Sequence, residues 1–214
     1  MICELDQLVV RRSGRTVIDR FDLQVAAGEC IGLVGKNGCG KSTLVMAIAG
    51  VLAPSAGRVS IAGANVWGSA AQRRLARRAL GYVPEAADPP GFLLAGELWA
   101  MVAASRGTEA PTPAMISALG LDELRDLALD RMSLGQRRRA CLGAAFLGPP
   151  KLLVLDEPDN GLDARRADAL VELLKAHCAE TNSAIVATHD RDLLARVNAR
   201  IVAVQAAAGD AGAG

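Results

Sequence analysis

The sequence predicts an α/β fold with a parallel sheet at its core, an antiparallel β side-subdomain and a helical insert. Short apolar runs at 30–34, 152–156 and 184–188 are typical of buried parallel strands. Between the last two runs, apolar residues repeat at three- and four-residue spacing, which predicts the crossover helix that parallel strands require. Residues 2–10 and 16–25 flank a polar turn and predict an antiparallel hairpin beside the core.

The segments between these runs are assigned from turn signals and apolar spacing. We expect a strand at 57–63, a short basic amphipathic helix at 70–80, a strand at 81–84 and helical structure from 96 to about 129. Pro111 and Pro113 interrupt the helical part, and proline favours the first turn of a new helix.

One domain is expected over residues 1–205, with the helical insert at about 86–140. The tail at 206–214 contains only Ala, Gly and Asp, so we expect it to be disordered.

Composition limits the classes of function. The chain has 214 residues and a formal net charge of +1, which gives no electrostatic footprint for a nucleic-acid partner. Arg73-Arg74 with Arg77-Arg78, and the run Arg137-Arg138-Arg139, are interpreted as solvated helix faces. Five cysteines without metal-ligand spacing are typical of reduced thiols in a cytosolic protein. No targeting signal or membrane span is predicted, so a membrane function would need another chain.

A phosphate-binding loop is predicted directly after the strand at 30–34. The segment fits the pattern Gly, four residues, Gly, Lys, Ser/Thr, and it reads Gly35-Lys36-Asn37-Gly38-Cys39-Gly40-Lys41-Ser42-Thr43. Its glycines would let backbone N–H groups surround a phosphate at a helix N-terminus. Lys41 would reach the β- and γ-phosphates, and the Ser42 hydroxyl would ligate Mg²⁺. A chance glycine-rich turn is the alternative, but strand, loop and helix stand in the right order for a nucleoside triphosphate site.

Two carboxylates end the apolar strand at 152–156. Asp156 is assigned to hold Mg²⁺, and Glu157 to orient or deprotonate an attacking water. An Asp-Glu pair that merely precedes a helix would look similar. The phosphate loop earlier in the chain favours the functional interpretation.

Met132-Ser133-Leu134-Gly135-Gln136 precedes that strand, and Thr188-His189-Asp190 follows the strand at 184–188. Taken alone, Ser133 is an ordinary N-cap and His189 a structural histidine. The order phosphate loop, Ser-x-Gly-Gln, Asp-Glu and His resembles that of the ATP-binding cassette (ABC) ATPases, from about residue 4 to residue 204.

The resemblance implies specific roles for these residues. Ser133, Gly135 and Gln136 correspond to the signature segment, with Met and Leu in place of Leu and Gly, which reaches the γ-phosphate held by a head-to-tail partner. Asp163 corresponds to the segment that couples the two sites, and His189 to the switch histidine at the γ-phosphate.

This sequence departs from the family's pattern at two positions. Arg12 stands where the family has an aromatic residue that stacks on adenine; a guanidinium can also stack on a base, with weaker selectivity. Glu85 replaces the glutamine after Gly81-Tyr82-Val83-Pro84, so we expect it near Mg²⁺ and the contact with a membrane subunit. The alternative for Glu85 is a solvated carboxylate paired with Arg78.

The sequence therefore predicts an ATPase that binds ATP and Mg²⁺, dimerises on ATP and drives a separate membrane-spanning permease, with export as the expected direction. Its partners would be that permease and a second copy of itself or a homologous ATPase subunit, with no nucleic acid. We expect it in the cytoplasm, peripheral on the cytoplasmic face of the inner membrane. The alternatives are the haem exporter ATPase of cytochrome c maturation, a soluble ABC ATPase acting on nucleic acid or ribosomes, and a nucleotide-dependent dimer with negligible turnover.

Overall fold

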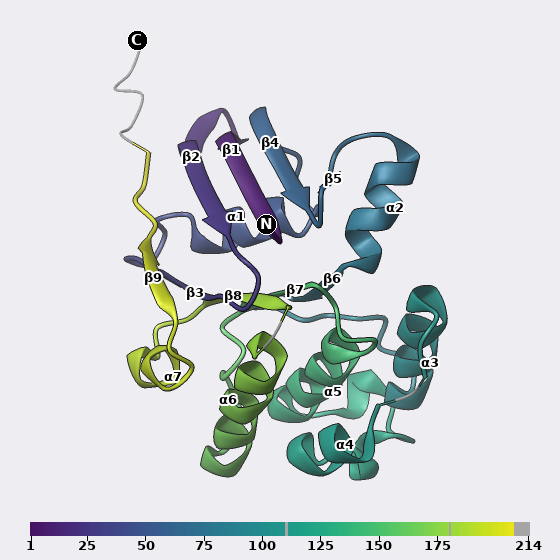
Figure 1. Cartoon of the computed structure of the whole chain (residues 1–214). Helices are drawn as coiled ribbons and strands as arrows, with labels where there is room; N and C mark the ends of the chain where they lie inside the picture. The colour runs from purple at the N-terminus through teal and green to yellow at the C-terminus, as the bar shows by residue number, and fades with distance from the viewer. Residues whose placement is uncertain (110, 180, 208–214) are drawn as a thin grey trace.

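The computed structural model describes residues 1–109, 111–179 and 181–207, and it contains two sheets with helices packed between and below them (Figure 1). The strands are β1 (Cys3–Arg12), β2 (Arg15–Val25), β3 (Cys30–Val34), β4 (Ala56–Ile61), β5 (Ala64–Asn65), β6 (Leu80–Val83), β7 (Leu152–Asp156), β8 (Ser183–Ala187) and β9 (Arg200–Ala203). The helices are α1 (Lys41–Ile48), α2 (Ala70–Arg78), α3 (Ala95–Arg106), α4 (Pro113–Leu119), α5 (Leu134–Phe146), α6 (Ala164–Cys178) and α7 (Arg191–Arg196), with 3-10 turns η1 (Asp122–Leu124) and η2 (Leu129–Arg131).

The larger sheet is parallel, in the order β6-β7-β8-β3-β9, and confirms the predicted core. Every residue of β7 and β8 is buried, as their continuous apolar sequences predict. The register places Asp156 beside Ala187, and Ala187 beside Leu33. The carboxyl ends of β7, β8 and β3 therefore meet at one edge, and the segments that follow these strands begin there.

The smaller sheet is antiparallel, in the order β2-β1-β4-β5, and includes the predicted hairpin. In β1, Cys3 and Leu5 are buried and Glu4 and Asp6 are exposed. This alternation is typical of a sheet with one face packed on the core and the other exposed to solvent. Helix α1 lies between the two sheets (Figure 1). Its apolar side chains and the inner faces of both sheets form one core cluster.

The helices α3, α4, α5 and α6 lie below the parallel sheet (Figure 1), and they enclose a second core cluster. The indole N–H of Trp99 in α3 donates to the carbonyl oxygen of Ala140 in α5 at 2.9 Å. Helix α5 carries the insert back to the sheet, because Leu142 and Phe146 are buried at its C-terminal end. A proline does begin α4, at Pro113.

Three short elements were not predicted: β5, α7 and β9. The edge strand β9 pairs with β3, but all four of its residues are at least partly exposed, so it lacks the buried apolar run of a central strand. The interpretation of Arg137-Arg138-Arg139 as a solvated face is wrong for two of the three residues. Arg138 is 2% exposed and Arg139 is 7% exposed. Both guanidinium groups donate to carbonyl oxygens through their terminal nitrogens, and Arg139 also pairs with Glu123 at 2.8 Å.

Within the described ranges, none of the helices has the length and apolar character needed to cross a membrane. Of the tail predicted to be disordered, residues 208–214 lie outside the described residues. The N–H of Ala207 donates to the carbonyl oxygen of Val17 at 3.4 Å.

Candidate active site

The phosphate loop leaves β3 at the carboxyl edge of the parallel sheet and leads into α1. Gly38 and Gly40 have φ values of 76° and 106°, which L side chains rarely adopt. A Cβ on Gly35 would lie 2.5 Å from both the Cys39 sulfur and the Val204 carbonyl oxygen. A side chain at these positions would therefore distort the loop.

The first turn of α1 offers unused backbone donors. Gly40 is its N-cap and provides no side-chain capping bond. The N–H groups of Lys41, Ser42 and Thr43 donate to no acceptor in the part of the chain that the structure describes. Such free N–H groups at a helix N-terminus favour a bound anion, so the loop fits a phosphate group.

Three groups from distant parts of the chain meet beside this loop. The ammonium nitrogen of Lys41 donates to the Gly35 carbonyl oxygen at 2.9 Å and lies 3.5 Å from His189 Nε2. His189 Nε2 lies 3.4 Å from Glu157 Oε1, and the His189 N–H donates to Glu157 Oε2 at 3.3 Å. A terminal phosphate here would meet an ammonium and an imidazole, with a carboxylate able to accept a proton from water.

Glu157 is held in a strained backbone conformation at the end of β7. Its φ is 47°, which is unfavourable for a residue with a Cβ, and its N–H donates to the Ala187 carbonyl oxygen at 2.7 Å. The side chain of Glu157 is 10% exposed, whereas that of His189 is 57% exposed. The carboxylate is therefore fixed, while the imidazole is open to solvent.

Asp156 lies beside the first turn of α1. Burial raises its pKa to about 6, a hydrogen bond with Ser42 opposes this shift, and the nearby carboxylates of Glu85 and Glu157 add to it. A divalent cation would remove this repulsion. The described residues contain no cluster of three His, Cys, Asp or Glu side chains for a metal. One carboxylate and one hydroxyl beside a phosphate loop nevertheless form the donor set expected for Mg²⁺.

Glu85 follows β6 on an exposed loop. Arg138, which was not predicted as a site residue, holds this loop against the site. The guanidinium of Arg138 donates to the carbonyl oxygens of Pro84 at 2.7 Å, Glu85 at 2.6 Å and Asp156 at 3.4 Å. In the described part of the chain, Glu85 forms no ion pair with Arg78, whose guanidinium donates to the Arg106 carbonyl oxygen at 3.3 Å. The backbone carrying Glu85 is thus tied to the end of β7. The only sequence signal for Arg138 was its place in a run of arginines.

Ser133, Gly135 and Gln136 lie at the N-terminus of α5, and no described contact joins them to the phosphate loop. Ser133 is the N-cap: its N–H donates to Gln136 Oε1 at 2.9 Å, and its hydroxyl oxygen accepts from the Gln136 N–H at 3.3 Å. A Cβ on Gly135 would lie 2.1 Å from the Gly161 carbonyl oxygen. Leu134, in the position of the missing glycine, is 65% exposed.

Asp163 caps α6, accepting from the Arg166 N–H at 2.9 Å and pairing with the Arg166 guanidinium at 3.0 Å. The segment before it is tied to the loop that carries His189. The Thr188 hydroxyl donates to Asp159 Oδ1 at 2.9 Å and accepts from the Asp190 N–H at 3.0 Å.

Arg12 is exposed at the end of β1, opposite Arg15 in the hairpin. The same hairpin touches the phosphate loop further along β2. A Cβ on Gly40 would lie 2.9 Å from Ile18 Cδ1 and 3.0 Å from Val17 Cγ1. Lys36 and Asn37 are exposed at the tip of the loop, and Cys39 is buried beneath it.

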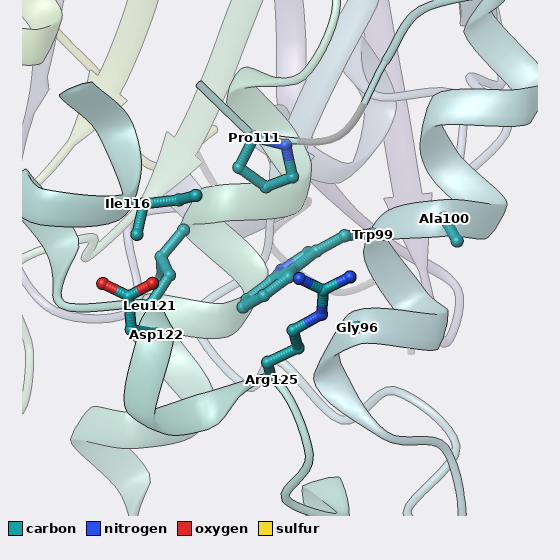
Figure 2. Close-up of a pocket in the computed structure, with 8 residues that line it drawn as sticks. All are labelled: Gly96, Trp99, Ala100, Pro111, Ile116, Leu121, Asp122 and Arg125. Atoms are coloured by element: carbon teal, nitrogen blue, oxygen red, sulfur yellow. The ribbon is translucent and has the colours of Figure 1, made fainter. Parts of the chain in front are cut away.

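A separate cavity of about 220 Å³ lies in the helical insert, between α3 and the segment around α4 and η1 (Figure 2). Its wall is formed by Trp99, Ile116 and Leu121, with Asp122 and Arg125 as its charged residues. It contains none of the predicted site residues.

Comparison with known proteins agrees with this geometry. The family described as "ABC transporter" matches residues 18–160. The Nod factor export ATP-binding protein I of Mesorhizobium japonicum is 34% identical and aligns with 82% of this chain and 52% of its own length. The protein of the same name from Neorhizobium galegae is 32% identical and aligns with 96% of this chain and 60% of its own length. The chain thus spans about half to three fifths of these relatives. A solved ATP-binding subunit of an ABC transporter is 26% identical, with a TM-score of 0.88 and coverage of 96% of this chain and 86% of its own.

Proposed function

This chain belongs to the ABC transporter family of ATPases, and we propose that it is the ATP-binding and hydrolysing subunit of an exporter, acting on a separate membrane-spanning permease. The observation that carries the proposal is the meeting of Lys41, His189 and Glu157 beside the free N–H groups of the phosphate loop. Anion-binding donors and a shielded carboxylate at one point are what hydrolysis of a terminal phosphate requires.

Each group has a distinct task in this proposal. The N–H groups of α1 and the Lys41 ammonium hold the phosphates, and the His189 imidazole meets the terminal one. Glu157 accepts a proton from the attacking water, since its backbone N–H is bonded to β8 and its carboxylate is held by the His189 N–H. Ser42 and Asp156 would hold Mg²⁺, which neutralises charge on the phosphates during transfer. Glu85 would add a third carboxylate near the ion.

The position of Ser133, Gly135 and Gln136 supports the proposal that the chain dimerises on ATP. These residues lie at the start of α5 without described contact to the phosphate loop of the same chain. In the proposed dimer they complete the partner's nucleotide site, as the family resemblance implies, and Asp163 lies near the same boundary. Export is proposed because the named relatives are export ATP-binding proteins. The permease and the position at the cytoplasmic face of the inner membrane belong to the same proposal.

Glu157→Gln tests the proposal, because an amide keeps the shape of the side chain but cannot accept the proton. We expect ATP binding to persist while steady-state phosphate release falls at least about a hundredfold, the lower range for loss of a general base. With ATP and Mg²⁺ the variant should elute as a dimer in size exclusion. The measurements are nucleotide affinity, phosphate release and elution volume on the same preparation.

Two further variants make the result specific. Glu4→Gln makes the same chemical change at an exposed position of β1 and should retain wild-type turnover. Lys41→Ala removes the buried ammonium and should lower both binding and turnover. Turnover of Glu157→Gln at the Glu4→Gln rate would remove Glu157 from the role of base. Unchanged ATP affinity in Lys41→Ala would mean that the nucleotide binds elsewhere.

A further inference from the structure

Helix α2 carries a concentrated positive charge that the proposed reaction does not use. Four arginines lie within six residues, at 73, 74, 77 and 78, and all four are exposed; we call them the arginine face. Together with Ser105 and Arg106 at the end of α3, they line a hollow of about 480 Å³. None of the described residues that line it carries a carboxylate. The whole chain has a formal net charge of only +1, so this charge is local.

The arginine face has few partners within the protein. Arg73 donates to the Gly68 carbonyl oxygen at 2.7 Å, and Arg78 to the Arg106 carbonyl oxygen at 3.3 Å. Over the described ranges, the guanidinium groups of Arg74 and Arg77 donate to no acceptor, and none of the four arginines forms an ion pair. Each guanidinium has five N–H donors, so most of the donors on this face are free for a ligand.

The stability of α2 does not explain this arrangement. Arg73 with Arg77, and Arg74 with Arg78, are like charges four residues apart, which disfavours a helix. Arg77 and Arg78 stand in the last turn, where the helix dipole favours a cation, but Arg73 and Arg74 stand nearer the N-terminus, where it does not. An external anion would relieve the repulsion among all four.

Arg106 supplies a fixed charge to the hollow. Its guanidinium donates to the carbonyl oxygens of Leu80 at 2.7 Å and Ala145 at 2.9 Å, and also to that of Leu147. Burial lowers the pKa of Arg106, and no carboxylate among the described residues forms an ion pair with it. The hollow therefore combines the held guanidinium of Arg106 with four exposed ones, of which those of Arg74 and Arg77 have no described partner.

We propose that the arginine face binds the phosphate groups of anionic phospholipids at a membrane surface. Phosphate oxygens match the fork geometry of guanidinium, and several headgroups side by side match several arginines on one helix. Leu75, which lies beside Arg78 at the edge of the arginine face, is 62% exposed and suits the boundary between headgroups and acyl chains. A soluble anion would gain nothing from that side chain. The inference rests on the proposed function, which places the chain against a membrane partner.

The test is co-sedimentation of the full chain with vesicles of phosphatidylcholine, with and without phosphatidylglycerol. Wild type should bind only the anionic vesicles and release them when salt rises from about 0.1 M to about 1 M, because the Debye length shortens from about 10 Å to about 3 Å. The variant is Arg74→Gln with Arg77→Gln, since neither side chain has a described partner. Each arginine near an anionic surface contributes about fivefold, so vesicle affinity should fall about thirtyfold.

The matched control is Arg20→Gln with Arg131→Gln, which removes the same charge from two exposed positions without described ion pairs. It should bind vesicles like the wild type. ATP hydrolysis in the absence of vesicles should be unchanged in both double variants. A failure of the lipid-binding proposal can therefore be distinguished from a failure of the proposed ATPase role. The inference is overturned if wild type hydrolyses ATP but ignores anionic vesicles, or if the two double variants bind alike. Capture of a single-stranded oligonucleotide through the arginine face, without vesicle binding, would overturn it too.

Discussion

Replacing Gly135 by Ala tests whether the start of α5 must lie directly against the segment before Asp163. The new Cβ would be 2.1 Å from the Gly161 carbonyl oxygen, and real Cβ contacts essentially never fall under 3.0 Å. One of the two backbone segments must therefore move by about 0.9 Å.

The expected magnitude follows from two opposing terms. Overpacking of a close contact costs about 1–3 kcal/mol, and replacing a helical Gly by Ala recovers up to about 1 kcal/mol. We expect a net loss of about 1–2 kcal/mol, which lowers the midpoint of thermal unfolding by about 2–8 °C for a chain of this size. ATP hydrolysis should fall at least about tenfold, because a shift of about 1 Å in a positioning segment has this scale of effect.

Gly96→Ala is the matched control. Gly96 is the second residue of α3, as Gly135 is of α5, but its Cβ would come no closer than 3.1 Å to Arg125. The control should unfold at the wild-type temperature or slightly above it and keep wild-type hydrolysis. Thermal denaturation by circular dichroism and phosphate release are measured on all three proteins. If Gly135→Ala behaves like Gly96→Ala in both assays, the contact with Gly161 has no role in hydrolysis.

Three further predictions concern single side chains. Glu85→Gln should strengthen ATP binding when Mg²⁺ is scarce and change little at saturating Mg²⁺, because it removes a negative charge close to Asp156; superimposable Mg²⁺ titrations would make Glu85 a surface charge. Arg12→Tyr should tighten ATP binding modestly and sharpen the preference for ATP over GTP, measured by competition binding, whereas unchanged values would place the base elsewhere. Burial lowers the pKa of His177 to about 4 from 6.5, so its neutral form stabilises the fold above pH 6.5 and that contribution is lost as pH falls from 6.5 toward 4. His177→Leu should therefore flatten the fall in unfolding free energy between pH 7 and 5 by about 1–2 kcal/mol in urea titrations, and equal slopes for both proteins would exclude this titration.

Much of the architecture was predictable from local sequence. The parallel strands were predicted because strands buried on both faces have continuous apolar sequences. The hairpin was predicted because two segments with apolar residues flank a polar turn. The phosphate loop was found because its glycines and Lys41 stand at fixed spacing between a strand and a helix. The short edge strand β9 was missed because only its pairing with β3 makes it a strand.

Arg138 shows a further limit of local patterns. In sequence it belongs to a polar run at the start of a helix, which is the pattern of an exposed face. In the fold it is buried, because Pro84 and Glu85 after β6 and Asp156 at the end of β7 bring carbonyl oxygens to it. No property of the run itself separates Arg138 from Arg137, whose side chain is partly exposed.

The chemical groups of this protein and the elements that carry them were therefore predictable from the chain, because helix and strand periods and the phosphate loop depend on residues that are close in sequence. The positions of Lys41 and His189 relative to each other come from the fold: these residues are 148 positions apart, yet their side-chain nitrogens lie 3.5 Å from each other, with Glu157 beside them. The physical reason is the strand register, since Leu33, Ala187 and Asp156 lie side by side and bring the three following segments to one edge. The hollow beside the arginine face likewise exists only because the end of α3 packs near α2.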